Sequence, residues 1–251
     1  MNALEEFVGR CLEVMASHLV AEAILATLGA LIIVRIWNPL KHQLAARKWC
    51  ARAIDVGIRN FYPDRESYAR DRPLLFAPYL QSTKHSLRYV GHWLAFTIEQ
   101  HQMMKTLCEI ANSGRKVHLV LLNPEIPANI LETYARYFGE DEKSLRSEIR
   151  NTWESVRAEW RSLSAQGKEC MDLRMHCEFI PYSAFWFDRD HSYGHILIDM
   201  KIYGATRKDA YGIELHSASG VQSSYPSLFK RYATSLALLE TRSFKDASSS
   251  S

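Results

Sequence analysis

The stretch Ile98–Leu122, IEQHQMMKTLCEIANSGRKVHLVLL, decides the fold of this chain. Its first part carries apolar residues at helical spacing, and the pattern stops shortly before Gly114, a residue type that commonly ends helices. Its last part, Lys116–Leu122, is a nearly continuous apolar run, which is typical of a strand in a sheet covered on both faces. The stretch therefore predicts a helix over 98–112 followed by a buried strand.

The segment before this helix, Ser86–Trp93 (SLRYVGHW), alternates like a strand. A strand, a helix and a strand in this order predict a right-handed crossover between parallel strands. Asn123 and Pro124 then end the second strand at its carboxyl edge, where α/β proteins place their ligands. The sequence thus predicts an α/β fold with a candidate site at that edge.

The rest of the chain continues the alternation of helices and strands. Before this unit we expect an extended piece broken by Pro63 and a short helix over 74–84. Later helices are expected where apolar residues recur at three- and four-residue steps, over 127–138, 142–166 and 228–242, with Gly167 stopping the second. Further strands are expected over 172–180, 185–188, 195–200 and 211–216. Together they predict a mixed sheet with flanking helices, in two similarly built halves.

The composition argues against several classes of protein. A formal net charge of +3 over 251 residues gives no signal for a dedicated nucleic-acid binder. The five cysteines form no CxxC pair and have no matching histidines, so we expect no disulfide framework, no metal site and no cofactor. The sequence also lacks a Gly-rich phosphate loop, HExxH and GxSxG, which lowers the expectation of common hydrolase and nucleotide-triphosphate classes.

The N-terminal segment carries an apolar block, Ala23–Val34 (AILATLGALIIV), with a cluster of basic residues only after it; the residues before it are mainly acidic and include one arginine, Arg10. This asymmetry follows the positive-inside rule, so we expect a single-pass protein of the inner cell membrane with its C-terminal domain in the cytoplasm. A spanning helix needs ~20 residues, which requires it to run from about Ser17 to Trp37. A core or oligomerisation helix and an interfacial helix are the alternatives.

Four segments follow from this interpretation. They are an anchor region over 1–40, a basic juxtamembrane helix over 41–56, an α/β domain over 57–242 and a disordered tail over 243–251. The basic helix either lies against anionic headgroups or is a linker with a solvated face. Small residues in the anchor allow helices to approach closely in lipid, which predicts a homodimer; they are Ala26, Gly29 and Ala30.

Several short motifs together resemble the phospholipase D-like superfamily. They are GIxxFYPDRxxY from Gly57, VGHW from Val90, GxKVHLVLLNP from Gly114, HILID from His195 and LFKRYATSLALL from Leu228. The resemblance covers about residues 55–242. It implies the mixed α/β sheet of that superfamily, in a degenerate branch that is often joined to membrane or regulatory segments.

Active members of this superfamily use two His-x-Lys motifs, each followed by an aspartate. One histidine attacks phosphorus, the other protonates the leaving oxygen, and the lysines neutralise the phosphate. Here His195 and Asp199 match the histidine and the acid, but Leu197 stands where lysine is expected. In the first half, His92 is followed by Leu94. Because no His-x-Lys occurs in the sequence, the resemblance implies a site without the lysines that hold phosphate.

Four candidate ligand-binding residues each have a structural alternative. Arg65 follows a Pro-Asp turn and either binds phosphate in a fork geometry or pairs with a neighbouring acid. Tyr62 either stacks on a base or packs in the core. His92 is either a ligand contact or a hydrogen-bonded structural histidine, and Asn123 either orients a ligand or caps the next turn.

His195 is the strongest single candidate and the only candidate catalytic residue. Asp199 lies inside an apolar run and must be paired if it is buried, so it is a candidate ligand contact or a structural lock. Glu214, in YGIELHS, has the same two interpretations. Trp153 and Trp160 share a helix face, and we expect both to pack in the core.

Three functions are compatible with these observations. The first is a membrane-anchored, non-catalytic sensor or effector that binds a nucleotide, another phosphorylated small ligand or a protein partner. The second is a membrane-associated phosphodiesterase or nuclease with a non-standard site around His195. The third, a purely structural oligomer, rests on the N-terminal helices alone. The distance between His92 and His195 separates the first two, because an enzyme of this superfamily needs both histidines at one phosphorus atom.

Overall fold

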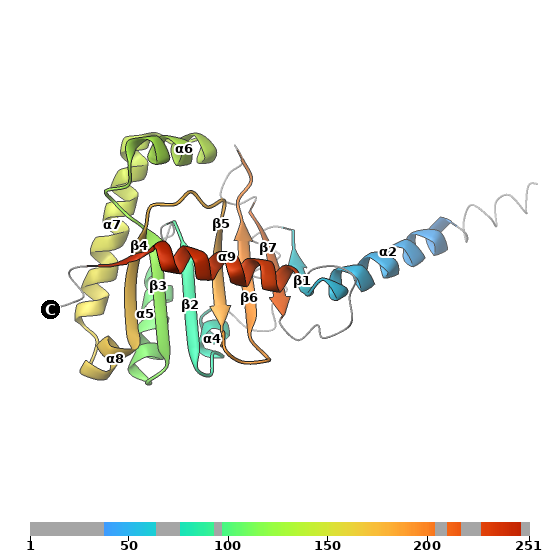
Figure 1. Ribbon diagram of the computed structural model, residues 1–251, viewed down its shortest axis with the longest axis horizontal. Coiled ribbons are helices and arrows are strands. Elements are labelled where there is room, and N and C mark those ends of the chain that lie inside the picture. The colour runs from blue at the N-terminus through green and yellow to red at the C-terminus, as the bar shows by residue number, and fades with distance from the viewer. Residues whose placement is uncertain (1–37, 64–75, 93–96, 204–209, 217–226, 247–251) are drawn as a thin grey trace, which may run out of the picture. The chain divides into compact units, whose positions relative to one another are not determined.

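A computed structural model describes residues 38–63, 76–92, 97–203, 210–216 and 227–246 of the chain (Figure 1). The chain divides into two compact units, Met1–Arg52 and Ala53–Ser251. The described helices are α2 Asn38–Asp55, α4 Phe76–Gln81, α5 Thr97–Asn112, α6 Ala128–Phe138, α7 Glu142–Arg161, α8 Ala165–Cys170 and α9 Leu228–Arg242. The strands are β1 Ile58–Tyr62, β2 Ser86–Gly91, β3 Lys116–Leu122, β4 Met171–His176, β5 Tyr182–Phe187, β6 His195–Met200, β7 Tyr211–His216 and β8 Phe244–Lys245.

α2 is a basic helix with exposed apolar side chains. Trp49 and Ile54 are 69% and 60% exposed, and the Arg52 guanidinium lies 5.8 Å from the centre of the Trp49 ring. Within the described ranges, no helix has the length and apolar character that crossing a membrane requires. The apolar block Ala23–Val34 lies outside those ranges, so the expected membrane anchor stays a prediction.

The eight described strands form one mixed sheet in the order β1-β7-β6-β5-β2-β3-β4-β8. β2, β3 and β4 are parallel, and all other neighbours are antiparallel. The predicted strand–helix–strand crossover is therefore present. The expectation of two similar halves is wrong, because residues 188–194 between β5 and β6 are too few for a parallel crossover, which needs a dozen or more residues.

Helices cover the two faces of the sheet unequally. Buried side chains of α5, α6 and α7 share one core with Leu87, Leu119 and Phe187 of the sheet. α9 crosses the opposite face, with Leu236 and Leu239 in a second core (Figure 1). We call these two sides of the sheet the α5 face and the α9 face.

The prediction that Trp153 and Trp160 pack in the core is confirmed. They are 1% and 7% exposed, and Trp153 donates a hydrogen bond of 2.8 Å to the Leu122 carbonyl oxygen.

The expected helix over 142–166 is broken after Arg161, and Gly167 is not its stop. Asn112 Oδ1 accepts hydrogen bonds from the backbone N–H and hydroxyl of Ser164, and the Ser164 hydroxyl caps α8 at Gly167. A Cβ atom on Gly167 would lie 2.2 Å from Asn112 Oδ1. The glycine is therefore required for the close contact between α5 and α8.

Candidate functional site

His92 and His195 lie at opposite ends of the sheet. Phe187 of β5 pairs with both Leu87 of β2 and His195 of β6, so His195 is level with the start of β2. His92 follows the end of β2, five residues beyond Leu87. At a rise of about 3.3 Å per residue, the two histidines are separated by roughly 16 Å along the strands alone. They do not meet at a common point.

His92 belongs to a polar group at the carboxyl edge of β2, which we call the carboxyl-edge cluster: His92, Ser183, Asp199 and Lys201. Ser183 and Asp199 are paired residues of β5 and β6, and the Lys201 ammonium forms an ion pair with the Asp199 carboxylate. Both charged groups act on His92 electrostatically. The cluster thus joins a histidine, a lysine and an acid from strands far apart in the sequence.

His92 is held as a neutral, buried side chain. Its Nε2 atom is hydrogen-bonded to the Ile180 carbonyl oxygen, and its ring meets Tyr134 and Phe138 edge-on at 5.1 and 5.3 Å between centroids. Burial lowers the pKa of His92 to about 3. These contacts are those of a hydrogen-bonded structural histidine, one of the two interpretations given above. At neutral pH the uncharged ring offers no positive charge to a phosphate.

Aromatic side chains continue from Tyr134 to the surface. Tyr137 meets Phe179 and Tyr203 edge-on, at 5.4 and 5.6 Å between centroids. Phe179 is 38% exposed and Tyr203 64% exposed, and the Tyr137 hydroxyl donates to the Lys201 carbonyl oxygen at 2.6 Å. We call Tyr137, Phe179 and Tyr203 the aromatic rim. It presents ring faces and edges beside the lysine of the carboxyl-edge cluster.

Asn123 also lies at the carboxyl edge, where it caps a turn. Its Oδ1 atom accepts a hydrogen bond of 3.0 Å from the Glu125 backbone N–H, and its Nδ2 atom lies 3.5 Å from the Cys177 sulfur. The first contact forms an Asx turn. Asn123 therefore caps the turn after β3, which is one of the two roles considered for it above.

His195 belongs to a second group, at the other end of β6. We call it the histidine cluster: Asn60, Tyr79, His195, Glu214 and His216. The His195 ring is stacked between Phe187 and His216, with centroids 4.3 and 5.1 Å away, and its Nε2 atom lies 3.1 Å from the Tyr79 hydroxyl. Burial lowers the pKa of His195 to about 4, against the opposing charge of Glu214. At neutral pH this ring is uncharged.

Glu214 is the ionised centre of the histidine cluster. Its carboxylate accepts hydrogen bonds from His216 Nε2 at 3.0 Å, Asn60 Nδ2 at 2.5 Å and the Tyr62 hydroxyl at 3.4 Å. Burial alone would raise the pKa of Glu214, but the hydrogen bonds from His216 and Asn60 lower it to about 2. A carboxylate that orients one imidazole beside another is suited to general acid–base chemistry.

The predicted site residues are therefore divided between two places. His92, Asn123 and Asp199 lie at the carboxyl edge, whereas His195 lies in the histidine cluster. Tyr62 is 6% exposed and contacts that cluster through the hydrogen bond from its hydroxyl to Glu214. Arg65 lies outside the described residues.

Sequence reasoning missed Lys201 and His216. Each lies two residues after an acid that was singled out, Asp199 or Glu214, a spacing that places both side chains on the same face of a strand. Asp188 was missed as well. Its carboxylate accepts hydrogen bonds from the backbone N–H groups of Lys84, His85 and Ser86 at 2.7–3.2 Å.

In the parts of the chain that the structure describes, no group of three or more histidine, cysteine or acidic side chains is arranged to hold a metal ion.

Comparisons with known proteins add little to this geometry. No protein-family model matches the chain, and no curated protein matches it in sequence. Among solved structures, the chain is similar to the crystal structure of phosphatidylserine synthase from Haemophilus influenzae Rd KW20, with a TM-score of 0.46 and 9% identity. The matched region covers 68% of this chain and 36% of that enzyme, so the chain spans about a third of its length. A similarity of this degree leads to no conclusion about activity.

Proposed function

We propose that the unit Ala53–Ser251 is a phospholipase D-like domain that binds a phosphorylated small ligand, such as a nucleotide, without hydrolysing it. The observation that carries the proposal is the separation of His92 and His195. A two-histidine phosphodiesterase needs a nucleophile and a proton donor on opposite sides of one phosphorus atom. Within one copy of this chain, two neutral histidines at opposite ends of the sheet do not meet that requirement.

The carboxyl-edge cluster and the aromatic rim favour a nucleotide-like ligand. Lys201 supplies a cation for phosphate, and Tyr203 and Phe179 offer exposed rings on which a base stacks. Binding needs only complementary donors and surface, not groups aligned for a transition state.

Calorimetric titration of the full-length protein with nucleoside mono-, di- and triphosphates tests this assignment. Tyr203→Ala and Lys201→Ala should each weaken binding about tenfold or more. Tyr193→Ala removes a tyrosine that is 42% exposed and follows the other end of β5, so it should leave binding unchanged. Equal affinities in all four proteins would contradict the site.

A phosphodiesterase is the second candidate, favoured by the contact between His195 and His216. Their stacked rings and the Glu214 carboxylate provide two imidazoles and an orienting acid within one cluster. If this is the working site, His216→Ala and Glu214→Gln abolish turnover of a phosphodiester substrate and Lys201→Ala does not.

We further propose a membrane anchor in residues 1–40 and a homodimer, both supported by the sequence alone. The apolar block with a basic flank supports the anchor, and the small residues Ala26, Gly29 and Ala30 support helix association. Alkaline carbonate extraction tests the anchor, because an integral protein stays in the membrane pellet. The mass of the detergent-solubilised full-length protein over a range of concentrations tests the dimer, and a strictly monomeric mass contradicts it.

A further inference from the structure

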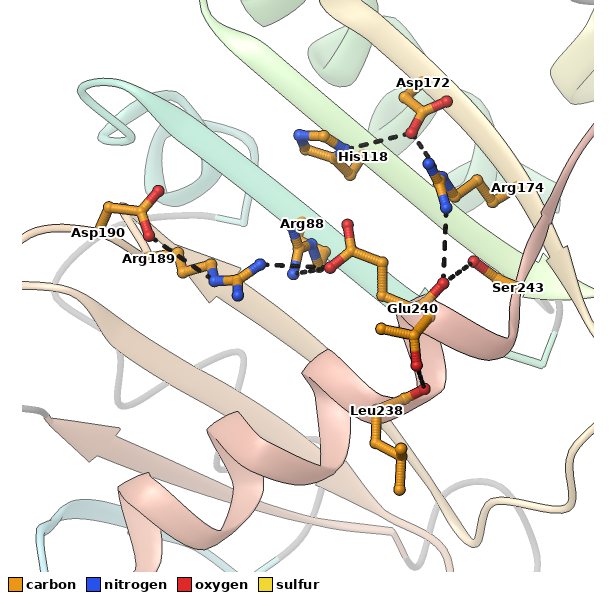
Figure 2. Close-up of polar contacts among 10 residues, drawn as sticks. Arg88, His118, Asp172, Arg174, Arg189, Asp190, Leu238, Glu240 and Ser243 are labelled. Carbon is orange, nitrogen blue, oxygen red and sulfur yellow. Dashed lines mark hydrogen bonds and ion pairs between the residues drawn. The ribbon is translucent and has the colours of Figure 1, made fainter.

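The α9 face carries a row of charged side chains across neighbouring strands, shown in Figure 2. Arg88 of β2 is paired in register with Trp186 of β5 and with His118 of β3, and His118 is paired with Asp172 of β4. Arg174 follows on β4, with its Nε atom 2.7 Å from Asp172 Oδ2. This row lies on the opposite side of the sheet from both clusters described above.

Two arginines of this face converge on one carboxylate oxygen. Arg88 Nη1 lies 2.7 Å from Glu240 Oε2, and Arg189 Nη1 lies 3.2 Å from the same atom (Figure 2). Both guanidinium groups lie over the Trp186 ring, at 5.5 and 5.0 Å from its centre. We call Arg88, Arg189 and Trp186 the arginine clamp.

The clamp has more donors than Glu240 can satisfy. The Arg88 side chain is 8% exposed, and its buried Nε atom has no hydrogen-bond partner among the described residues. Each guanidinium carries five N–H donors in a planar fork that matches the oxygens of a phosphoryl group. Burial lowers the pKa of Arg88, and the Glu240 charge opposes that effect. An anion with more charge than a carboxylate would stabilise the buried Arg88 guanidinium further.

The position of Glu240 in α9 also indicates that the contacts with the clamp, rather than helix stability, explain why an acidic residue stands here. Glu240 lies in the last turn of the helix, where the backbone carbonyls make a negative charge unfavourable. The Glu240 backbone carbonyl accepts from the Ser243 hydroxyl at 2.6 Å, with Arg174 Nη1 3.5 Å away. The Glu240 side chain is 18% exposed, so the clamp lies within reach of solvent.

We propose that the arginine clamp is a binding site for a phosphoryl group and that Glu240 occupies it as an internal substitute. Arg88 and Arg189 hold the anionic oxygens, and Trp186 supports both guanidinium planes. The phosphoryl group belongs either to a soluble phosphate compound or to a lipid headgroup. This site is distinct from the carboxyl-edge cluster and does not depend on the proposed function.

Glu240→Gln in the full-length protein gives the sharpest test. If Glu240 is an internal substitute for a phosphoryl group, the variant binds phosphate compounds more tightly, whereas if Glu240 is only a structural ion-pair partner, it does not. If Glu240 is an internal substitute, removing its charge makes inorganic pyrophosphate bind about tenfold more tightly at constant ionic strength. Pyrophosphate should also raise the melting temperature of this variant more than that of the wild type. Glu132→Gln removes the same charge from an exposed pair on α6 and should behave like the wild type.

Arg189→Ala checks that the gain occurs at the clamp. Arg189 is 36% exposed, so its removal should leave the protein folded, and in the Glu240→Gln background it should cancel the tighter binding. Lys201→Ala should retain it, which separates this site from the carboxyl-edge cluster. The proposal is overturned if Glu240→Gln binds pyrophosphate no more tightly than the wild type, or if the gain survives Arg189→Ala.

Vesicles of equal parts phosphatidylcholine and phosphatidic acid distinguish the two sources of the phosphoryl group. Because the proposed anchor can itself associate with vesicles, the readout is the excess of flotation over vesicles of phosphatidylcholine alone. An excess that is lost in Arg189→Ala and competed by pyrophosphate identifies a lipid headgroup. Pyrophosphate binding with the same flotation in Arg189→Ala as in the wild type identifies a soluble phosphate compound. Both outcomes support the clamp.

Discussion

His92 and His195 project from the same sheet but at opposite ends of it, and the pairing of β2, β5 and β6 fixes their separation. Each side chain is held in place by a hydrogen bond, from His92 to the Ile180 carbonyl and between His195 and the Tyr79 hydroxyl. To bring the two rings to one phosphorus atom, the strands would have to slip by several residues. Such a slip would move their apolar side chains out of both cores. The separation is therefore a stable property of the fold.

Acid should destabilise the protein through its buried histidines. The folded-state pKa values of His92 and His195 are lowered to about 3 and about 4, and burial also lowers that of His176. Below pH 6.5 the unfolded chain binds protons that the folded chain excludes, so stability falls as the pH falls. Between their folded and unfolded pKa values, His92 and His195 each contribute up to about 1.4 kcal/mol per pH unit. Glu214, with a folded pKa of about 2, stabilises the fold above its unfolded value of 4.5 and loses that effect only at lower pH.

Urea unfolding between pH 7.5 and 5.0 measures this effect without interference from Glu214. We expect the free energy of unfolding to decrease near pH 5.5 with a slope of about 2.5 kcal/mol per pH unit from His92 and His195, to which His176 adds in the same direction. His195→Phe keeps a flat ring between Phe187 and His216. It should reduce the slope by the contribution of one proton, up to about 1.4 kcal/mol per pH unit. A flat profile in the wild type would contradict the burial of these histidines.

Asp188, a buried turn residue, should be important for stability. Its side chain holds the backbone of Lys84, His85 and Ser86, although its own φ is +47°, in the left-handed region. Asparagine tolerates this conformation, so Asp188→Asn removes the charge without adding strain. We expect a loss of about 1.5–3 kcal/mol by urea unfolding. Asp190→Asn, at a side chain that is 86% exposed, should change stability by less than about 0.5 kcal/mol.

Gly167→Ala should destabilise the contact between α5 and α8. The added methyl group would meet Asn112 Oδ1 at 2.2 Å and disturb its hydrogen bonds to Ser164. A loss of about 1–3 kcal/mol is expected. In an Asn112→Ala background the same substitution should cost much less, because the atom that it meets is gone. Equal costs in both backgrounds would mean that the contact does not limit this position.

Much of the fold could be predicted from local patterns. β3, β6, β7 and α9 have the predicted bounds, because continuous or regularly spaced apolar residues determine where these elements begin and end. The break between α7 and α8 could not be predicted, since it depends on a contact of Ser164 with Asn112 on another helix. Sheet order was also beyond the sequence patterns, because it depends on pairing between distant strands.

The candidate site was predictable only in part for the same reason. Asp199 was singled out as an acid in an apolar strand, and its pairing with Lys201 follows from their two-residue spacing at the end of β6. Placing His92 and His195 at one site assumed two similar halves that close on each other. The antiparallel pairing of β5 with both β2 and β6 separates the two residues instead. The arginine clamp joins β2, the loop after β5 and the end of α9, and no sequence motif marks that combination.

Turnover of phosphodiesters by the purified full-length protein tests the central claim most directly. The panel should contain a phosphatidylcholine vesicle, single- and double-stranded DNA and a chromogenic phosphodiester, with His195→Ala as the control. Loss of a preorganised donor commonly lowers rates about 10²–10³-fold, and this fold also separates the two histidines. We therefore predict no turnover above that of His195→Ala, together with nucleotide binding that Lys201→Ala weakens. Robust turnover that disappears in His195→Ala would contradict the account and establish the enzyme.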